Sequence, residues 1–450
     1  MYENATFVDW LQSRRWYFER GEEIATVEPI WQYRVLDDED GDFDLTIVRL
    51  TFASGGTSAY FIPVAVANGE EAIDHPAFQR WLLRSLNDAG VTPPDLQWNR
   101  VGTGVPAGWQ DLTGSLLTVE QSNSSIRYGD QVMIKVNRRL TVGPSPEAEL
   151  IPVIARAVDR SFAPVGYGTL WQTSALESST CLAVCTAYVP NLGDGWSFML
   201  ELANQDLEAV IDEARTIGDV TARMHAGLIS DPWRAEVAPE PIRSSDTARW
   251  TSSALSDLDQ LVGELNRRQE SFAQDAKSLA ELLPAAVPVL RERLSGLAGL
   301  AGTSQIRIHG DYHLGQLLRT TEGTWVVVDF DGEPNRPLSE RRGKFSALRD
   351  VASMMRSFSY LRGTLERSTE SARSRSEWIA WEDALRAAFM EAYANALQTG
   401  DVVLIPDGEE ALQDALSALE LEKAIYECRY EMATRPDWLA LPLSRLVRTR

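Results

Sequence analysis

Residues 308–334 read IHGDYHLGQLLRTTEGTWVVVDFDGEP and hold the densest group of chemically useful side chains in this chain. Two short apolar runs, QIRIHG (305–310) and TWVVVDFDG (324–332), predict two strands that form a hairpin within a region of helical sequence. The ends of these strands deliver two carboxylates, those of Asp311 and Asp329. The pattern therefore predicts a site built at strand ends.

The order and spacing of these residues are typical of kinases. Asp311 stands five positions before Gln316, as a catalytic Asp stands before a metal-binding amide in the kinase Asp-x-x-x-x-Asn loop. Asp329, in Asp-Phe-Asp-Gly, takes the place of the Mg²⁺-binding Asp of Asp-Phe-Gly. Carboxylate and amide oxygens suit a hard cation such as Mg²⁺. Both fragments in the right order predict a phosphoryl-transfer site.

The other half of such a site is expected upstream. QVMIKVNRR (131–139) places Lys135 in a strand, where its ammonium can reach the α- and β-phosphates of ATP. PEAEL (146–150) supplies Glu149 on the next helix as the ion-pair partner of that lysine. The preceding turn carries hydroxyls and amides in place of the usual glycines. Its candidate phosphate-binding residues are Gln121, Ser122, Asn123 and Ser124.

The charge balance excludes several classes of partner. The 450 residues include 43 Lys and Arg against 65 Asp and Glu, which gives a formal net charge of −22. A surface this acidic repels nucleic-acid phosphates and anionic lipid headgroups, so we expect no nucleic-acid and no membrane partner. A small anionic ligand stays possible where a few cations or a metal reverse the local field.

The compartment follows from cysteine usage and from the absence of targeting patterns. Three cysteines, Cys181, Cys185 and Cys428, cannot form a disulfide framework and are typical of a reducing compartment. The N-terminus has no basic start followed by an apolar core, and no run reaches about 18 uncharged apolar residues. We therefore expect a cytoplasmic protein.

The order of predicted elements gives an α+β chain of three domains. Residues 1–92 predict a small module with an antiparallel sheet, and residues 93–189 a β-rich lobe with one helix at 144–158. Residues 190–450 predict a large helical lobe. Its helical segments are 197–226, 245–300, 346–366, 376–398 and 409–433.

Together with these motifs, three further segments make the chain resemble the bacterial maltokinase family, in the aminoglycoside-phosphotransferase branch of protein-kinase-like folds. They are RRWYFERGEE (14–23), RDVASMMRSF (349–358) and LELEKAIYECRYEMATRPDWLALPL (419–443), so the resemblance covers the whole chain. It implies a bilobal kinase fold preceded by an N-terminal cap domain, with ATP and Mg²⁺ as cofactors. Close relatives in this family include kinases that prefer glucosamine. The chain departs from maltokinases at Asp331, where they usually have Glu.

The resemblance also implies roles for individual residues. Asp311 would be the catalytic base, while Gln316 and Asp329 would hold Mg²⁺. Lys135 would bind phosphate oxygens, with Glu149 fixing it. Thr186 and Tyr188 fall in the hinge segment that would meet adenine, and His313 and Asp350 would support the catalytic loop.

The sugar side is expected on the C-terminal helix, where acids and aromatic rings alternate at helical spacing. Carboxylates bind sugar hydroxyls and rings stack on the apolar faces of sugars. The candidate sugar-binding residues are Asp311, His313, Glu420, Glu427, Tyr430, Glu431 and Trp438. The alternative interpretation is an ordinary amphipathic helix with a solvated acidic face.

Several functional alternatives stay open on the sequence alone. His309, Asp311 and His313 could form the metal cluster of a hydrolase, which would leave Lys135 and Asp329 unexplained. The chain could also be an aminoglycoside-modifying phosphotransferase or an inactive nucleotide-binding protein. Among sugar acceptors, glucosamine is favoured because carboxylates near the site would attract its ammonium. Maltose, phosphorylated to maltose 1-phosphate, is the alternative.

Overall fold

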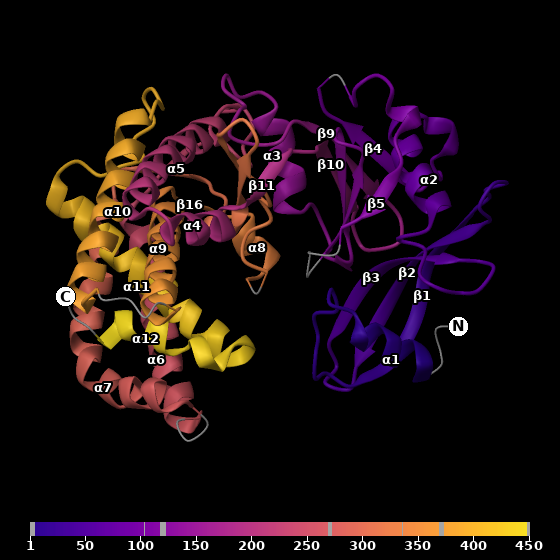
Figure 1. Cartoon of the computed structure of the whole chain (residues 1–450). Coiled ribbons are helices and arrows are strands. Elements are labelled where there is room, and N and C mark those ends of the chain that lie inside the picture. The colour runs from indigo at the N-terminus through magenta and orange to yellow at the C-terminus, as the bar shows by residue number, and fades with distance from the viewer. Residues whose placement is uncertain are drawn as a thin grey trace. The chain divides into compact units, whose positions relative to one another are not determined.

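The computed structural model describes residues 5–102, 104–117, 123–268, 272–334, 336–368 and 373–447. The chain divides into two compact units (Figure 1). The first comprises Met1–Arg156 with Pro164–Pro190, and the second comprises Ala157–Ala163 with Asn191–Arg450. The predicted α+β fold class is confirmed.

The first unit begins with a four-stranded antiparallel sheet in the order β1-β2-β3-β8. Its strands are β1 (Ile24–Val35), β2 (Phe43–Phe52), β3 (Thr57–Ala65) and β8 (Arg139–Leu140). Alternate β2 residues enter two different cores, with Leu45 and Ile47 on one face and Val48 and Leu50 on the other. Side chains on a strand alternate between faces, so this sheet is covered on both sides. Helix α1 (Ala5–Ser13) lies in the second core and α2 (Pro76–Asn87) in the first.

A six-stranded antiparallel sheet in the order β4-β9-β10-β7-β6-β5 completes the first unit. Its strands are β4 (Leu96–Arg100), β5 (Gly114–Leu116), β6 (Asn123–Tyr128), β7 (Val132–Asn137), β9 (Gly166–Gln172) and β10 (Thr180–Ala187). The hairpin expected at Gly129 is confirmed, because Tyr128 pairs with Val132 across it. The predicted helix at 144–158 is α3 (Pro146–Ile154), which Ser145 caps by accepting from the Ala148 N–H. Cys181 and Cys185 on β10 are buried and free, as is Cys428 in the second unit.

The second unit is mainly helical, as expected. Its longer helices are α4 (Gly195–Ala203), α5 (Leu207–Leu228), α6 (Ser244–Arg268), α7 (Gln274–Leu294), α9 (Leu348–Ser368), α10 (Arg375–Ala396), α11 (Glu409–Thr434) and α12 (Ala440–Val447). Apolar side chains of α6, α7, α11 and α12 share one core. None of the helices in the described part of the chain has the length and apolar character needed to cross a bilayer.

Two small sheets in the second unit carry the segments singled out in the sequence. One has the order β11-β14-β15 and the other β12-β13-β16. Their strands are β11 (Asn191–Asp194), β12 (Glu240–Pro241), β13 (Ser304–Arg307), β14 (Leu317–Thr320), β15 (Trp325–Val327) and β16 (Lys344–Ser346). The hairpin predicted between 305–310 and 324–332 is therefore wrong. β15 pairs with β14, which reaches it through a tight turn closed by Thr320 and Gly323, whereas β13 pairs with β12 and β16.

A glycine sets how closely α5 and α10 can approach. A Cβ atom placed on Gly218 of α5 would lie 2.3 Å from the backbone oxygen of Phe389 on α10. That distance is far inside van der Waals contact, so only a residue without a side chain fits there. The close approach matters because α5 also carries His225, a residue of the site described below.

Replacing Gly218 by Ala is expected to destabilise the protein by about 1–3 kcal/mol, because the helices must separate to admit the methyl group. Urea titration followed by circular dichroism measures the change. Gly263→Ala on α6 is the matched control, because the nearest atom to its Cβ is the flexible end of Arg267. It should be stabilising by about 0.5–1 kcal/mol through helix propensity. Equal effects of the two substitutions would contradict the packing argument.

Candidate active site

A buried carboxylate holds the segment that connects β13 to η5 (Leu314–Gln316). Asp350, in the first turn of α9, is 1% exposed. Its Oδ2 accepts the backbone N–H of His309 at 2.8 Å, and its Oδ1 accepts that of Gly310 at 2.9 Å. Burial alone would raise the pKa of Asp350, but the hydrogen bond with His225 and the nearby N–H groups outweigh it and hold that pKa below its ordinary value. The expected role of Asp350 as a support of this loop is confirmed.

His225 is the second member of this support. Its Nε2 lies 3.2 Å from Oδ2 of Asp350, and its Nδ1 lies 2.9 Å from the hydroxyl of Tyr393 on α10. The side chain is fully buried. His225 is therefore a packed, hydrogen-bonded residue that ties α5 and α10 to α9.

His309 joins the two segments that the sequence picked out. Its Nε2 donates to the backbone oxygen of Val328 at 2.9 Å, while its Nδ1 accepts the N–H of Asp311 at 3.3 Å. This bridge replaces the expected hairpin as the reason why the segments of Asp311 and Asp329 meet. Because both ring nitrogens are engaged, neither is free to bind a metal. The hydrolase-like cluster of His309, Asp311 and His313 therefore does not fit the structure.

The predicted magnesium ligands lie next to each other. Gln316 Nε2 is 3.4 Å from Oδ2 of Asp329, and the backbone oxygen of Gln316 accepts the Val328 N–H at 2.9 Å. Asp329 has a φ of 65°, a left-handed conformation that is uncommon for residues other than glycine and costs about 1–3 kcal/mol. With the Gln316 amide turned so that its oxygen faces Asp329, the amide oxygen and the carboxylate form a donor set that suits Mg²⁺. Gln316 and Asp329 therefore fit Mg²⁺, the ion that the sequence predicts at this position.

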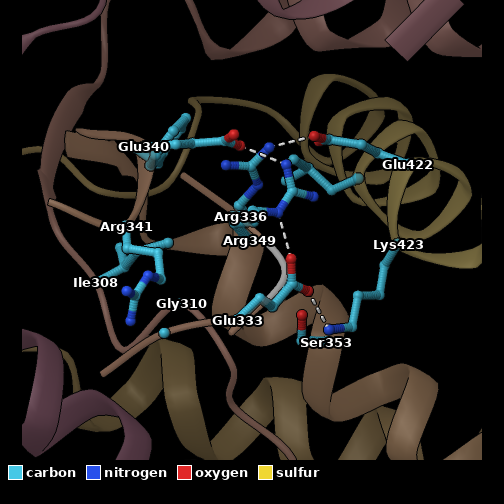
Figure 2. A pocket seen from close by; sticks show the side chains of 13 residues that line it. Ile308, Gly310, Glu333, Arg336, Glu340, Arg341, Arg349, Ser353, Glu422 and Lys423 are labelled. Carbon is cyan, nitrogen blue, oxygen red and sulfur yellow. Dashed lines mark hydrogen bonds and ion pairs between the residues drawn. The ribbon is translucent and has the colours of Figure 1, made fainter. Parts of the chain in front are cut away.

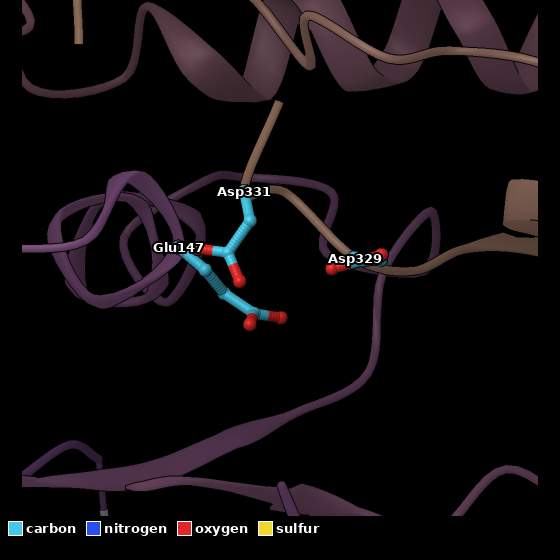
Figure 3. Close-up of side chains that lie close together, drawn as sticks. All are labelled: Glu147, Asp329 and Asp331. Atoms are coloured by element: carbon cyan, nitrogen blue, oxygen red, sulfur yellow. The ribbon is translucent and has the colours of Figure 1, made fainter. Parts of the chain in front are cut away.

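Asp331 lies two residues further along the same loop. Figure 3 shows its carboxylate and that of Asp329 on this segment. The backbone oxygen of Asp331 accepts from Nη1 of Arg341 at 3.0 Å. The departure from the maltokinase pattern therefore falls directly beside the predicted metal ligands.

The carboxylate of Asp311 lies beside a largely buried lysine that the sequence reasoning missed. Nζ of Lys423, on α11, is 3.6 Å from Oδ1 of Asp311 and also pairs with Glu333. Glu333 in turn pairs with Arg336 (Figure 2). His313 Nε2 is 3.9 Å from the other oxygen, Oδ2 of Asp311. The predicted base thus has a cation on one side and an imidazole on the other.

Charge compensation explains how Glu333 and Lys423 stay ionised while buried. Burial alone would raise the pKa of Glu333, but Lys423 and Arg336 lower it from 4.5 to about 2. Burial would lower the pKa of Lys423, yet Glu333 and Asp311 hold it above its ordinary value. Lys423 and Glu333 line a pocket with Gly310, which precedes Asp311 (Figure 2). The only signal in the sequence was a lone cation in the acidic run LELEKAIYE (419–427).

In the first unit, Lys135 lies on β7 and forms an ion pair with Glu147 of α3. Glu147, which Figure 3 also labels, was missed by the sequence reasoning. Glu149 lies on the same helix and is buried, and its predicted contact with Lys135 stays a prediction. The two glutamates share the first turn of α3, so the sequence offered no basis for choosing between them.

The predicted phosphate turn is partly a strand. Asn123 and Ser124 belong to β6, where they pair with Asn137 and Val136 of β7. They are therefore not turn residues, whereas Gln121 and Ser122 lie outside the described residues. On the predicted hinge, Thr186 ends the pairing of β10 with β9. Its neighbour Tyr188 donates its backbone N–H to Gln131, and Arg127 stacks 4.2 Å from its ring centre.

The glutamates of α11 that were predicted to bind sugar form ion pairs with arginines. Glu420 pairs with Arg386, Glu427 with Arg356 and Glu431 with Arg435. All three glutamates are buried, so the alternative of a solvated acidic face is wrong. Each of these carboxylates is balanced by a guanidinium, and their roles in sugar binding stay predictions.

The predicted sugar-stacking rings also have internal partners. Trp438 stacks on Tyr360 with ring centres 6.3 Å apart, and Tyr430 stacks on Tyr426 at 6.4 Å. A stacked ring offers at most its other face to a ligand. The roles of Tyr430 and Trp438 in sugar binding stay predictions.

Comparison with known families gives two matches. Residues 10–82 match the maltokinase N-terminal cap domain, and residues 180–332 match the phosphotransferase enzyme family. The chain is 31% identical to a glucosamine kinase of Mycolicibacterium smegmatis over 337 residues, which cover 72% of this chain and 77% of that one. It is 28% identical to a glucosamine kinase of Streptacidiphilus jiangxiensis over 372 residues, covering 80% and 78%.

Solved structures show the same fold. A glucosamine kinase in complex with glucosamine, ADP and inorganic phosphate has a TM-score of 0.70 at 23% identity and covers 99% of both chains. A second crystal form of a glucosamine kinase has a TM-score of 0.71 at 24% identity, covering 94% of both chains. At these identities the likeness establishes the fold.

Replacing Glu333 by Gln is expected to change how the free energy of unfolding depends on pH under acidic conditions. Because the pKa of Glu333 is lowered to about 2 on folding, its contribution is present above pH 4.5 and is lost as the pH falls towards 2. As the pH falls through this range, the free energy of unfolding should therefore decrease less steeply in the variant than in the wild type, by up to about 1.4 kcal/mol per pH unit. Urea unfolding at several pH values measures both slopes, and parallel slopes would contradict the assignment.

At neutral pH the same substitution should cost about 3–5 kcal/mol, because it leaves Lys423 buried without its main counter-charge. Glu340→Gln is the matched control, since Glu340 pairs with the same Arg336 but its side chain is 33% exposed. Its cost should be about 0–1 kcal/mol.

Proposed function

Since the chain belongs to the maltokinase-like sugar kinases, which include the glucosamine kinases, and is itself a kinase, we propose that it transfers the γ-phosphoryl group of ATP to a hydroxyl of glucosamine. The observation that carries this proposal is the loop held by Asp350, in which Asp311 lies beside Lys423 and Gln316 lies beside Asp329. We further propose that the protein acts in the cytoplasm, where ATP is abundant.

Asp311 is assigned as the general base of the transfer. It accepts the proton of the sugar hydroxyl while that oxygen forms a bond to the γ-phosphorus, and the bond from that phosphorus to the bridging oxygen of ADP breaks. Lys423, 3.6 Å from Oδ1, fixes the direction of this carboxylate. His313 borders Oδ2, so a hydroxyl can be oriented between the imidazole and the base.

Gln316 and Asp329 are assigned as the residues that hold Mg²⁺. The metal would neutralise charge on the phosphates during the transfer. Gln316 must then present its amide oxygen, which a rotation of the amide group supplies. The bridge from His309 to Val328 keeps the Asp329 segment in place.

The nucleotide is assigned to residues of the first unit. Lys135 would bind phosphate oxygens, and Glu147 keeps its ammonium in place through their ion pair. Thr186 and Tyr188 would meet the adenine ring, as the family resemblance implies. Asn123 and Ser124 stay candidates for phosphate contacts at the start of β6.

The choice of acceptor rests on the relatives. Both curated kinases reported above are named glucosamine kinases, and so are the two solved structures. Maltose is the second candidate, because residues 10–82 match the cap domain of maltokinases. The charge argument for an amino sugar no longer contributes, since Glu420, Glu427 and Glu431 are paired with arginines.

A coupled assay of ADP release with glucosamine, maltose, glucose and kanamycin tests the proposal. Glucosamine is expected to give the highest kcat/KM. Faster turnover of maltose would replace the proposed acceptor, and a preference for kanamycin would indicate an antibiotic-modifying enzyme. ATP binding without turnover of any acceptor would overturn the proposed activity.

Two substitutions separate the base from the metal ligand. Asp311→Asn should lower kcat by about 10²–10⁴-fold with nearly unchanged ATP binding, because only proton transfer is lost. Asp329→Asn should instead raise the Mg²⁺ concentration needed for half-maximal activity. Steady-state kinetics across a magnesium series distinguishes the two. Wild-type turnover of Asp311→Asn would contradict the role of Asp311 as the base. An unchanged magnesium response of Asp329→Asn would contradict the role of Asp329 as a metal ligand.

A further inference from the structure

A second pocket of the helical unit is lined by arginines, and Asp311, Gln316 and Asp329 are not among its lining residues. It has a volume of about 510 Å³, which is the size of small-molecule sites. Helices α7, α9, α10, α11 and α12 contribute to it, and these pack against one another (Figure 1). Its basic residues are Arg293, Arg356, Arg362, Arg386 and Arg445, and its acidic residues are Glu382, Asp383 and Glu420.

Three of the five arginines are neutralised by carboxylates. Arg356 donates twice to Glu427, at 2.8 and 3.1 Å. Arg386 donates through both terminal nitrogens to Glu420. Arg362 pairs with Glu382 at 2.5 Å and with Glu366. These pairs form the structural part of the pocket wall.

Arg293 has no carboxylate partner within the part of the chain that the structure describes. Its Nε and Nη2 both donate to the hydroxyl of Ser417, at 3.2 and 2.6 Å, and its Nη1 is buried without a hydrogen bond. A neutral hydroxyl satisfies hydrogen-bonding capacity and leaves the charge of the guanidinium unbalanced.

Arg445 is similarly incomplete. Among the described residues its one ion pair is to Glu420, at 3.6 Å from Nε, and that nitrogen is buried without a hydrogen bond. Glu420 is already held by both terminal nitrogens of Arg386, so it is shared between two guanidiniums. Burial and the neighbouring Arg356 and Arg293 outweigh Glu420 and lower the pKa of Arg445 to about 10. Arg293 and Arg445 are therefore the two guanidiniums of the pocket wall whose hydrogen-bonding capacity and charge are incompletely matched.

We propose that this pocket binds the phosphate group of a small phosphorylated molecule, with Arg293 and Arg445 as the donors. Guanidinium groups offer two parallel N–H donors, a geometry that matches phosphate oxygens. A phosphate dianion would balance the two incompletely paired guanidiniums and supply acceptors for the buried Nη1 of Arg293 and Nε of Arg445. The volume leaves room for a phosphomonoester as well as for inorganic phosphate.

An occupied pocket would be connected to the site of the proposed reaction through one helix. Arg356 lines the pocket and pairs with Glu427, which lies one turn after Lys423 on α11. Glu427 is also one of the charges that raise the pKa of Lys423. A ligand that draws Arg356 away from Glu427 would therefore change the electrostatic potential at Lys423.

Isothermal titration calorimetry with inorganic phosphate and with glucose 6-phosphate tests the proposal, performed on the full chain with saturating ADP and Mg²⁺ to fill nucleotide sites. We expect saturable binding of phosphate to the wild type. Arg293→Gln and Arg445→Gln should each weaken it at least about tenfold, because a charge-assisted pair of hydrogen bonds is removed. Arg291→Gln is the matched control, since Arg291 lies on the same helix in an exposed pair with Asp259 and should bind like the wild type.

Ser417→Asp tests the site without removing either arginine. The new carboxylate would neutralise Arg293 from within and should abolish phosphate binding while leaving the melting temperature unchanged or higher. This variant keeps the proposal testable if the arginine substitutions disturb folding. Equal affinity for both probes would identify inorganic phosphate as sufficient, and tighter binding of the ester would identify a phosphomonoester. Absence of binding, or binding that Ser417→Asp and Arg445→Gln leave intact, would overturn the proposal.

Discussion

The carboxylate of Asp350 is the constraint on which the site depends. It accepts two consecutive backbone N–H groups, those of His309 and Gly310, at 2.8 and 2.9 Å, while His225 lies against the same oxygen as the first. Three elements far apart in the sequence, α5, the loop after β13, and α9, are thereby fixed relative to one another. Since His309 also reaches Val328, the loop of Asp311 and the loop of Asp329 share one reference point.

Buried charges in the helical unit are compensated by ion pairs with side chains of opposite charge. The chain is strongly acidic overall, yet the buried glutamates of α11, Glu420, Glu427 and Glu431, are each matched with a guanidinium. Buried ion pairs contribute little net stability but are costly to break singly, so they fix geometry. One side of α11 orients Lys423 towards Asp311, and Glu420 on the same helix enters the arginine-lined pocket. A single helix thus contributes both to the proposed active site, through Lys423, and to the arginine-lined pocket, through Glu420.

Local patterns were predictable from the sequence, and long-range pairings were not. Asp311, Gln316 and Asp329 follow a short spacing rule, and the alternation in β2 and β3 reveals strands directly. By contrast, β13 pairs with β16, almost forty residues later, and no local feature excludes the nearer β15. The partners of Glu420 and Glu427 are 34 and 71 residues away, so their burial and neutralisation were invisible in the sequence. Lys423 was missed for the same reason, since its neighbours Asp311 and Glu333 come from a distant segment.

The left-handed backbone of Asp329 has a consequence for protein engineering. At a φ of 65° glycine would relieve the strain, so a screen for heat tolerance would select glycine at this position. Such a variant would gain melting temperature and lose the carboxylate that we assign to magnesium. Thermal selection without a test of turnover would therefore enrich inactive protein, and position 329 is one to hold fixed in any library.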